Sequence, residues 1–182
     1  MNNNWFASVP NFITIGRLVL TPAAISLIVE RQWSAAFVLY AIAGFSDALD
    51  GWMARTYNLQ SELGAILDPI ADKALIVSMY VTLAIVDALP PWLAIMVVFR
   101  DFMITGAVSL AWLMGRPMTV RPHFSSKATT AAQLTLAGVI LAARAYGVHI
   151  PLLDVTLITL VAALTVASAC VYLWLWVQHM RL

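Results

Sequence analysis

Residues 155–180 read VTLITLVAALTVASACVYLWLWVQHM and contain no Asp, Glu, Lys or Arg. A helix that crosses a lipid bilayer needs about 20 predominantly apolar residues, and this stretch exceeds that length. No other charge-free run in the chain is longer than about 18 residues. The stretch therefore predicts a transmembrane helix near the end of the sequence.

The composition of the whole chain agrees with a membrane location. Of 182 residues, 62% are hydrophobic, and charge is limited to 10 Lys and Arg and 9 Asp and Glu. A soluble domain has about a quarter charged residues, so a soluble enzyme and a disordered chain are both excluded. The net charge of +1 leaves no basic excess for nucleic acid. We expect one membrane domain over residues 1–182.

Shorter apolar segments upstream complete the pattern of an all-α integral membrane protein. Their charged residues lie within or beside apolar runs, where function concentrates in membrane proteins. We expect six transmembrane helices, with edges uncertain by a few residues: about 11–29, 33–54, 65–87, 91–115, 125–144 and 152–177.

The distribution of Lys and Arg predicts the orientation. Five of them fall on the side that carries the second and fourth loops and the C-terminus, and two fall on the other side. The first group is Arg55, Arg116, Arg121, Lys127 and Arg181; the second is Arg31 and Arg144. Because basic residues collect on the cytoplasmic side, we expect both termini and the active site to face the cytoplasm, across a bacterial inner membrane. The N-terminus lacks a basic region before its first apolar segment, which predicts an anchor and not a cleaved signal.

A cluster of acidic residues lies around the second loop. Residues 46–73 read SDALDGWMARTYNLQSELGAILDPIADK. Asp47 and Asp50 are three residues apart near the end of the second expected helix, and Asp68 and Asp72 are four apart at the start of the third. Each pair therefore shares one helix face. A short loop makes the two helices antiparallel neighbours, so the four carboxylates are expected to converge.

Four converging carboxylates need compensation by positive charge. Carboxylate and water oxygens suit Mg²⁺ or Mn²⁺. Gly51 and Gly64 allow close approach of a ligand, and the planar guanidinium of Arg55 suits a phosphate. Two other interpretations remain open: interfacial charges solvated by headgroups and paired with Arg55 and Lys73, and an ion-coupled transporter. Acids at helix ends, away from the bilayer midplane, argue against transport.

The acidic segment resembles a known family signature. Asp47-x2-Asp50-Gly51-x2-Ala54-Arg55-x8-Gly64-x3-Asp68-x3-Asp72 matches the motif of the CDP-alcohol phosphotransferase family. The resemblance extends over the chain through Pro10-Asn11, Thr14 and Arg17 at the start and through Lys127 and Gln133 later.

The resemblance implies roles for these residues. It assigns Asp47, Asp50 and Asp68 to a centre of two divalent ions, with Asp72 as the general base and a shared ligand. Gly51, Arg55 and Gly64 fall where the family holds the cytidine diphosphate moiety. The implied donor is CDP-diacylglycerol, and the implied assembly is a homodimer.

Two further stretches predict the acceptor alcohol, because they resemble the cardiolipin synthases of this family. Those enzymes use phosphatidylglycerol as the acceptor and release CMP. The first stretch is residues 65–73 together with Arg100-Asp101, and the second is residues 121–127. The alternative acceptor is glycerol 3-phosphate, used by the phosphatidylglycerophosphate synthases. Those enzymes commonly carry an arginine shortly after a Thr-Gly pair, whereas Thr105-Gly106 is followed here by Ala107, Val108 and Ser109.

Several other residues are candidates for substrate contact: Asn11, Arg17, Lys73, Arg100 and Lys127. Arg17 has two readings, a ligand for a lipid phosphate and an arginine that extends its side chain to the membrane surface. Arg100 and Asp101 lie well inside an apolar segment and need a cavity or partners; substrate contact and a structural ion pair are the alternatives. Lys127 is equally a candidate for a cytoplasmic anchor.

Overall fold

The computed structural model describes residues 5–56, 62–115, 124–148 and 151–181, with side chains described for 14–46, 70–111, 113–115, 126–148 and 151–179. The described residues form an all-helical structure. Its six helices are α1 (Trp5–Val29), α2 (Trp33–Thr56), α3 (Glu62–Ile85), α4 (Pro91–Leu113), α5 (Phe124–Tyr146) and α6 (Pro151–Arg181). The expected helix order is confirmed, and α1 and α6 extend several residues further than the sequence predicts.

The helices pack in a closed ring. Helix α1 packs on α2 and α3, α5 packs on α2 and α6, α4 packs on α3 and α6, and α3 also touches α5. In the described residues α2 and α3 therefore each pack along α1, although the sequence predicts that they pack on each other. Among the described residues, α1 separates α2 from α3 in the ring, and the two helices do not pack on each other.

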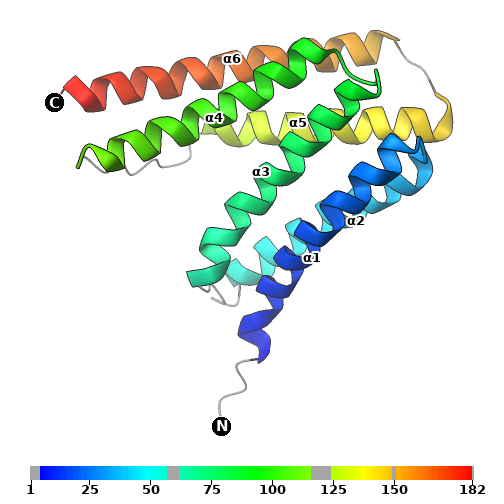
Figure 1. Ribbon diagram of the computed structural model, residues 1–182, viewed down its shortest axis with the longest axis horizontal. Coiled ribbons are helices and arrows are strands. Elements are labelled where there is room, and N and C mark those ends of the chain that lie inside the picture. Colours follow the sequence, from blue (N-terminus) through cyan, green and yellow to red (C-terminus); the bar gives the residue numbers. More distant parts are fainter. Residues whose placement is uncertain (1–4, 57–61, 116–123, 149–150, 182) are drawn as a thin grey trace.

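Successive helices run in opposite directions, which sorts the connections to two ends of the molecule. The turns from α1 to α2, α3 to α4 and α5 to α6 lie at one end, on the right of Figure 1. The start of α1, the end of α2, the start of α3, the end of α4 and the end of α6 lie toward the other end. Toward that second end, α1–α3 diverge from α4–α6 (Figure 1).

Each of the three turns at the first end contains one residue in the left-handed backbone conformation. Val148 N–H bonds Ala143 O at 3.0 Å after Gly147, which has φ 65°. This six-to-one bond across a left-handed residue is the Schellman motif that caps helix ends. Arg31 (φ 58°) and Asp87 (φ 57°) occupy the same left-handed position in the other two turns.

Two buried tyrosines attach the first half of the bundle to α5. The Tyr40 hydroxyl on α2 donates to Leu134 O at 2.7 Å, and the Tyr80 hydroxyl on α3 donates to Gln133 O at 3.0 Å. Each phenol satisfies its polar atom within the apolar core, as a buried tyrosine requires. A hydrogen bond between helices therefore offsets the desolvation free energy of each buried hydroxyl.

The lengths of the helices suit a bilayer. In the described chain three stretches are long and apolar enough to cross a membrane: Pro91–Ala111, Ser126–Tyr146 and Pro151–His179. Shorter apolar stretches occupy α1 (Thr14–Val29) and α2 (Trp33–Ser46). At 1.5 Å per residue, the 24 residues of α3 extend about 36 Å, more than the roughly 30 Å hydrocarbon core.

Candidate active site

The acidic motif lies where α2 ends and α3 begins. Asp47, Asp50, Gly51 and Arg55 are in the last turns of α2, and Gly64, Asp68 and Asp72 are in the first half of α3. Among these seven side chains, the structure describes that of Asp72; the others lie outside the described side chains. Because only residues 57–61 join the two helices, Thr56 and Glu62 lie within about 20 Å of each other. This end of the bundle can therefore gather the four aspartates.

Asp72 forms an ion pair with Arg17. A guanidinium nitrogen, Nη1 of Arg17 on α1, donates to Oδ1 of Asp72 on α3. The Arg17 side chain is 1% exposed, and that of Asp72 is 47% exposed. Burial of this degree rules out the reading in which Arg17 reaches the membrane surface. The pair fixes one side of the Asp72 carboxylate while half of that side chain remains accessible.

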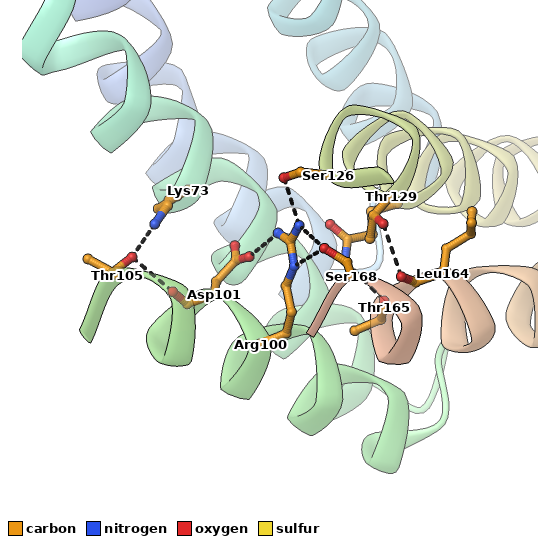
Figure 2. A network of polar contacts seen from close by, with 10 residues as sticks. Lys73, Arg100, Asp101, Thr105, Ser126, Thr129, Leu164, Thr165 and Ser168 are labelled. Atoms are coloured by element: carbon orange, nitrogen blue, oxygen red, sulfur yellow. Dashed lines mark hydrogen bonds and ion pairs between the residues drawn. The ribbon is translucent and has the colours of Figure 1, made fainter. Parts of the chain in front are cut away.

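Lys73, the next residue on α3, faces α4. Its ammonium donates to the Thr105 hydroxyl, which in turn donates to Asp101 O at 2.8 Å. Figure 2 shows this chain of contacts leading from Lys73 toward Arg100. Asp72 and Lys73 thus link α3 to α1 on one side and to α4 on the other.

Arg100 is the centre of a buried polar network between α4, α5 and α6 (Figure 2). Its Nη1 donates to Asp101 Oδ1 at 2.7 Å, and its Nη2 donates to the hydroxyls of Ser168 at 2.7 Å and Ser126 at 2.9 Å. Its Nε donates to Ser168 at 3.2 Å. All three guanidinium nitrogens therefore bond to the protein, and Asp101 compensates the charge.

Further polar contacts join α5 to α6 beside this network. The Thr129 hydroxyl donates to Leu164 O at 3.1 Å, and the Gln133 amide donates to the Thr165 hydroxyl at 3.4 Å. These side chains are buried, as are those of Arg100 and Ser168. Hydrogen bonds between helices satisfy polar groups for which lipid offers no partner.

Sequence reasoning missed the small polar residues of this network. Ser126, Thr129, Thr165 and Ser168 were not singled out, because hydroxyls are common in apolar helices. The available signal was Arg100: a buried guanidinium demands several acceptors. The spacing of Thr165 and Ser168, three residues apart on a charge-free helix, places both on one face and could have indicated where those acceptors lie.

Other predicted site residues lie further from these contacts or outside the described side chains. Lys127 is exposed on α5, next to the buried network. Asn11 is on α1, and its side chain is outside the described set.

A metal site is compatible with the placement of the acids, although no three potential ligands gather among the described side chains. Asp47, Asp50 and Asp68 are not among those side chains. The donor set is all carboxylate, which is the chemistry that Mg²⁺ and Mn²⁺ favour. The half-exposed carboxylate of Asp72 stands at the same end of α3, four residues from Asp68.

The arrangement of helices and acids defines the class of protein. The family model for CDP-alcohol phosphatidyltransferases matches residues 7–171. The chain belongs to this family, and the resemblance based on the aspartate motif is confirmed.

Individual relatives indicate the branches of the family that lie near this chain. It is 36% identical to human cardiolipin synthase (CMP-forming) over 160 residues, which are 79% of this chain and 52% of that protein. It is 34% identical to a chloroplastic CDP-diacylglycerol–glycerol-3-phosphate 3-phosphatidyltransferase of rice (Oryza sativa subsp. japonica), over 92% of this chain and 56% of that protein. A bacterial glycerol-3-phosphate 3-phosphatidyltransferase, from Cereibacter sphaeroides, is 36% identical over 57% of this chain and 49% of its own length. The chain thus spans about half the length of these relatives.

Proposed function

We propose that this protein is a CDP-diacylglycerol-dependent phosphatidyltransferase that makes cardiolipin and CMP from phosphatidylglycerol. One observation carries the proposal: the four aspartates of the family signature occur near the end of α2 and in the first half of α3, two consecutive helices within the matched residues 7–171. The identity to human cardiolipin synthase supports the choice of acceptor.

The proposed location is the inner membrane of a bacterium, which the chain crosses several times as one membrane domain, with the active site facing the cytoplasm. Helices α1, α2 and α3 are 24–25 residues long, close to what a bilayer requires, and pack directly on the three apolar helices or on one another. The end that holds the acidic motif is also the end at which α4 finishes (Figure 1), and in the sequence Arg116 and Arg121 follow α4 directly and Lys127 begins α5. The positive-inside rule makes this the cytoplasmic end.

Each residue of the motif has a part in the proposed reaction. Asp47, Asp50, Asp68 and Asp72 would hold two Mg²⁺ or Mn²⁺ ions, which neutralise the pyrophosphate of CDP-diacylglycerol and stabilise the departing CMP. Gly51, Arg55 and Gly64 bind the cytidine diphosphate moiety. Asp72 accepts the proton of the acceptor hydroxyl as its oxygen bonds to the lipid-side phosphorus and the bond from that phosphorus to CMP breaks. Arg17 keeps the Asp72 carboxylate in place for this transfer.

The charges around the site favour a lipid acceptor over glycerol 3-phosphate. Glycerol 3-phosphate is a dianion and needs cations beyond those that bind the pyrophosphate. Arg17 and Arg100 are engaged with Asp72 and Asp101. Phosphatidylglycerol enters from the bilayer with its own apolar anchor and needs fewer ionic contacts. The rice and Cereibacter relatives keep glycerol 3-phosphate as the second candidate.

The test is a set of reactions with purified protein, CDP-diacylglycerol and Mg²⁺ or Mn²⁺. Separate reactions contain phosphatidylglycerol, glycerol 3-phosphate, serine or inositol phosphate, and lipid product and CMP are measured in each. Cardiolipin should form from phosphatidylglycerol, and the other acceptors should react poorly. Faster product formation from glycerol 3-phosphate would assign the protein to the second candidate.

The same assay separates an enzyme from an ion-coupled transporter. A transferase releases CMP in stoichiometric amounts with lipid product, and the release stops when a chelator removes the divalent ions. A transporter releases none. We also propose a homodimer, which cross-linking in native membranes would test.

A further inference from the structure

Lys73 follows the proposed general base in the sequence, but its side chain contacts a different helix. Consecutive residues of an α-helix project about 100° apart around the axis, since one turn takes 3.6 residues. Asp72 accordingly pairs with Arg17 on α1, whereas the Lys73 ammonium donates to the Thr105 hydroxyl on α4. Two neighbouring residues therefore hold α3 from two sides.

The Thr105 hydroxyl is oriented to receive the Lys73 ammonium. A hydroxyl has one proton, and Thr105 donates its proton to Asp101 O at 2.8 Å, one helical turn earlier on α4. The oxygen of Thr105 is then left as an acceptor, which suits an ammonium group because that group has donors only. The backbone of α4 thus sets the direction in which Thr105 accepts.

The stretch of α4 that carries Thr105 is itself anchored to the rest of its half of the bundle. Arg100, five residues earlier, donates to Ser126 on α5 at 2.9 Å and to Ser168 on α6 at 2.7 Å. Figure 2 shows the series of contacts that begins at Lys73 and ends at these two serines. Three helices together therefore fix the acceptor that Lys73 meets.

The bond between Lys73 and Thr105 joins the two halves of the bundle where they separate. Toward the end at which α3 begins, α1–α3 diverge from α4–α6 (Figure 1). Tyr80, seven residues further along α3, donates to Gln133 O on α5, about 10 Å deeper in the bundle. The bond of Lys73 thus holds α3 closer to the acidic motif than that of Tyr80 does, one residue from Asp72.

A small rotation of α3 would misplace the proposed base. Side-chain atoms lie about 5 Å from a helix axis, so a rotation of about 10° moves the Asp72 carboxylate by roughly 1 Å. A misplacement of about 1 Å can lower a rate roughly a hundredfold. The ion pair with Arg17 restrains the carboxylate on one side, and the Lys73 contact restrains the helix against this rotation from another.

We propose that Lys73 and Thr105 are positioning residues for Asp72, which hold α3 against α4 and so set the direction of the proposed base. The inference rests on the proposed function, because it requires Asp72 to be the base; it applies to either candidate acceptor. It gives Lys73 a role other than the contact with substrate for which the sequence made it a candidate.

Kinetic constants test the proposal. Lys73→Met and Thr105→Val each remove one side of the bond and should lower kcat about tenfold, while KM for both substrates stays within about twofold. Lys73→Arg and Thr105→Ser keep a donor and an acceptor and should retain much of the activity. The double variant Lys73→Met with Thr105→Val should be no slower than Lys73→Met, because residues that act through one bond are not additive. Thr135→Val is the matched control: it removes an exposed hydroxyl with the same type of backbone bond, to Ala131 O at 2.8 Å, and should leave kcat unchanged.

A second background separates positioning from general stabilisation of the fold. In Asp72→Asn the proposed base is absent, so adding Lys73→Met should lower the residual rate no further. A residue that only stabilised the fold would lower the rate in both backgrounds, and a residue that bound substrate would raise KM in both.

A nitroxide label at Ile70, which is 54% exposed on α3, gives a readout that does not need turnover. Cys170 is first replaced by Ser, so that the label attaches at Ile70→Cys alone. Thr105→Val changes α4 only and should increase the mobility of the label on α3, whereas Thr135→Val should not. A wild type without transferase activity would refute the proposed function, and the label would still decide whether the bond holds α3 in place.

Three results would overturn the positioning role. The first is a raised KM with unchanged kcat in Lys73→Met, which would make Lys73 a substrate contact. The second is an equal loss of rate from Lys73→Met in the wild-type and Asp72→Asn backgrounds. The third is a label at Ile70 whose mobility is the same in Thr105→Val and Thr135→Val.

Discussion

Arg17 shows how one buried charge in an apolar bundle limits what its neighbours can be. A guanidinium removed from water loses a large solvation free energy, which an opposite charge must restore. Asp72 is that charge. The ion pair means that the proposed base is held by α1 while about half of its side chain stays exposed, the arrangement that a proton acceptor for a bound alcohol needs.

Replacement of Asp72 by Asn is expected to reduce turnover by at least about a hundredfold, because general-base catalysis contributes roughly 10²–10⁴-fold. Binding of CDP-diacylglycerol should remain close to wild type, since three of the four acids are unchanged. The measurement is CMP release at saturating Mg²⁺ together with a direct binding titration. Asp50→Asn is the comparison and should weaken metal binding as well. Substantial activity in Asp72→Asn would remove it from the role of base.

Replacement of Arg17 by Met is expected to lower kcat about tenfold or more while KM for each lipid changes little, because the residue positions Asp72 and does not bind substrate. Arg17→Lys keeps the charge without the planar fork and should retain part of the activity. Thr21→Ala, which loses a bond to the backbone of Arg17, serves as the control. A raised KM with unchanged kcat would instead favour the reading in which Arg17 binds a lipid phosphate.

At the scale of elements, hydrogen bonds between helices fix how the helices are oriented in the bundle, because apolar packing alone does little to select one arrangement. Lipid tails are as apolar as leucine side chains, so helices in a membrane gain no hydrophobic driving force from association. Arg100 bonds α4 to both α5 and α6, and Tyr40 and Tyr80 bond α2 and α3 to α5. These contacts orient the faces that carry the motif.

Replacement of Arg100 by Met is expected to destabilise the fold by about 3–5 kcal/mol, because it leaves Asp101 buried without its counter-charge. The double variant Arg100→Met with Asp101→Leu should recover part of the loss. Thermal unfolding in detergent measures both. If Arg100→Met kept the wild-type Tm and lost activity through a higher KM, Arg100 would act on substrate, as the sequence allows.

Replacement of Arg31 by Gly is expected to stabilise the α1–α2 turn by about 1 kcal/mol, because the left-handed region costs a residue with a side chain about that much. For a chain of this size the expected rise in Tm is about 2–4 °C. The reverse change at the equivalent position, Gly147→Ala, should lower Tm. Equal Tm values for the two variants would contradict this account of the turns.

For the whole molecule, the sidedness of the ring determines which compartment supplies the substrates. The end of α2 and the start of α3, which carry the acidic motif, lie toward the same end as the end of α4, the start of α1 and the end of α6 (Figure 1). Under the proposed function, a cytoplasmic position of that end would give access to soluble divalent ions and would release the water-soluble product CMP into the cytoplasm.

Cysteine labelling in intact cells tests the orientation. The single cysteine, Cys170, is exposed on α6 and is first replaced by Ser. A cysteine at Asn58 should be shielded from an impermeant thiol reagent, and one at Gln32, in the α1–α2 turn, should react. Lysed cells supply the control, in which Asn58→Cys also reacts. The opposite pattern would place the active site outside the cytoplasm.

The pattern of the sequence was enough for the helix count, the all-α class and the family. Long apolar runs, the breaks at Gly115, Gly147 and Pro151, and the spacing of the aspartates are local features, and local features set where a membrane helix begins and ends. The motif residues were found in the same way, since each aspartate pair is defined by three or four positions along one helix.

Tertiary structure alone decided which charges pair and which helices meet. Arg17 and Asp72 are 55 residues apart, Lys73 and Thr105 are 32 apart, and Arg100 and Ser168 are 68 apart. No period along the chain encodes such contacts, because they depend on the order in which six helices close into a ring. The same closure placed α1 between α2 and α3. It did so because side chains of helices distant in sequence share one set of buried polar partners.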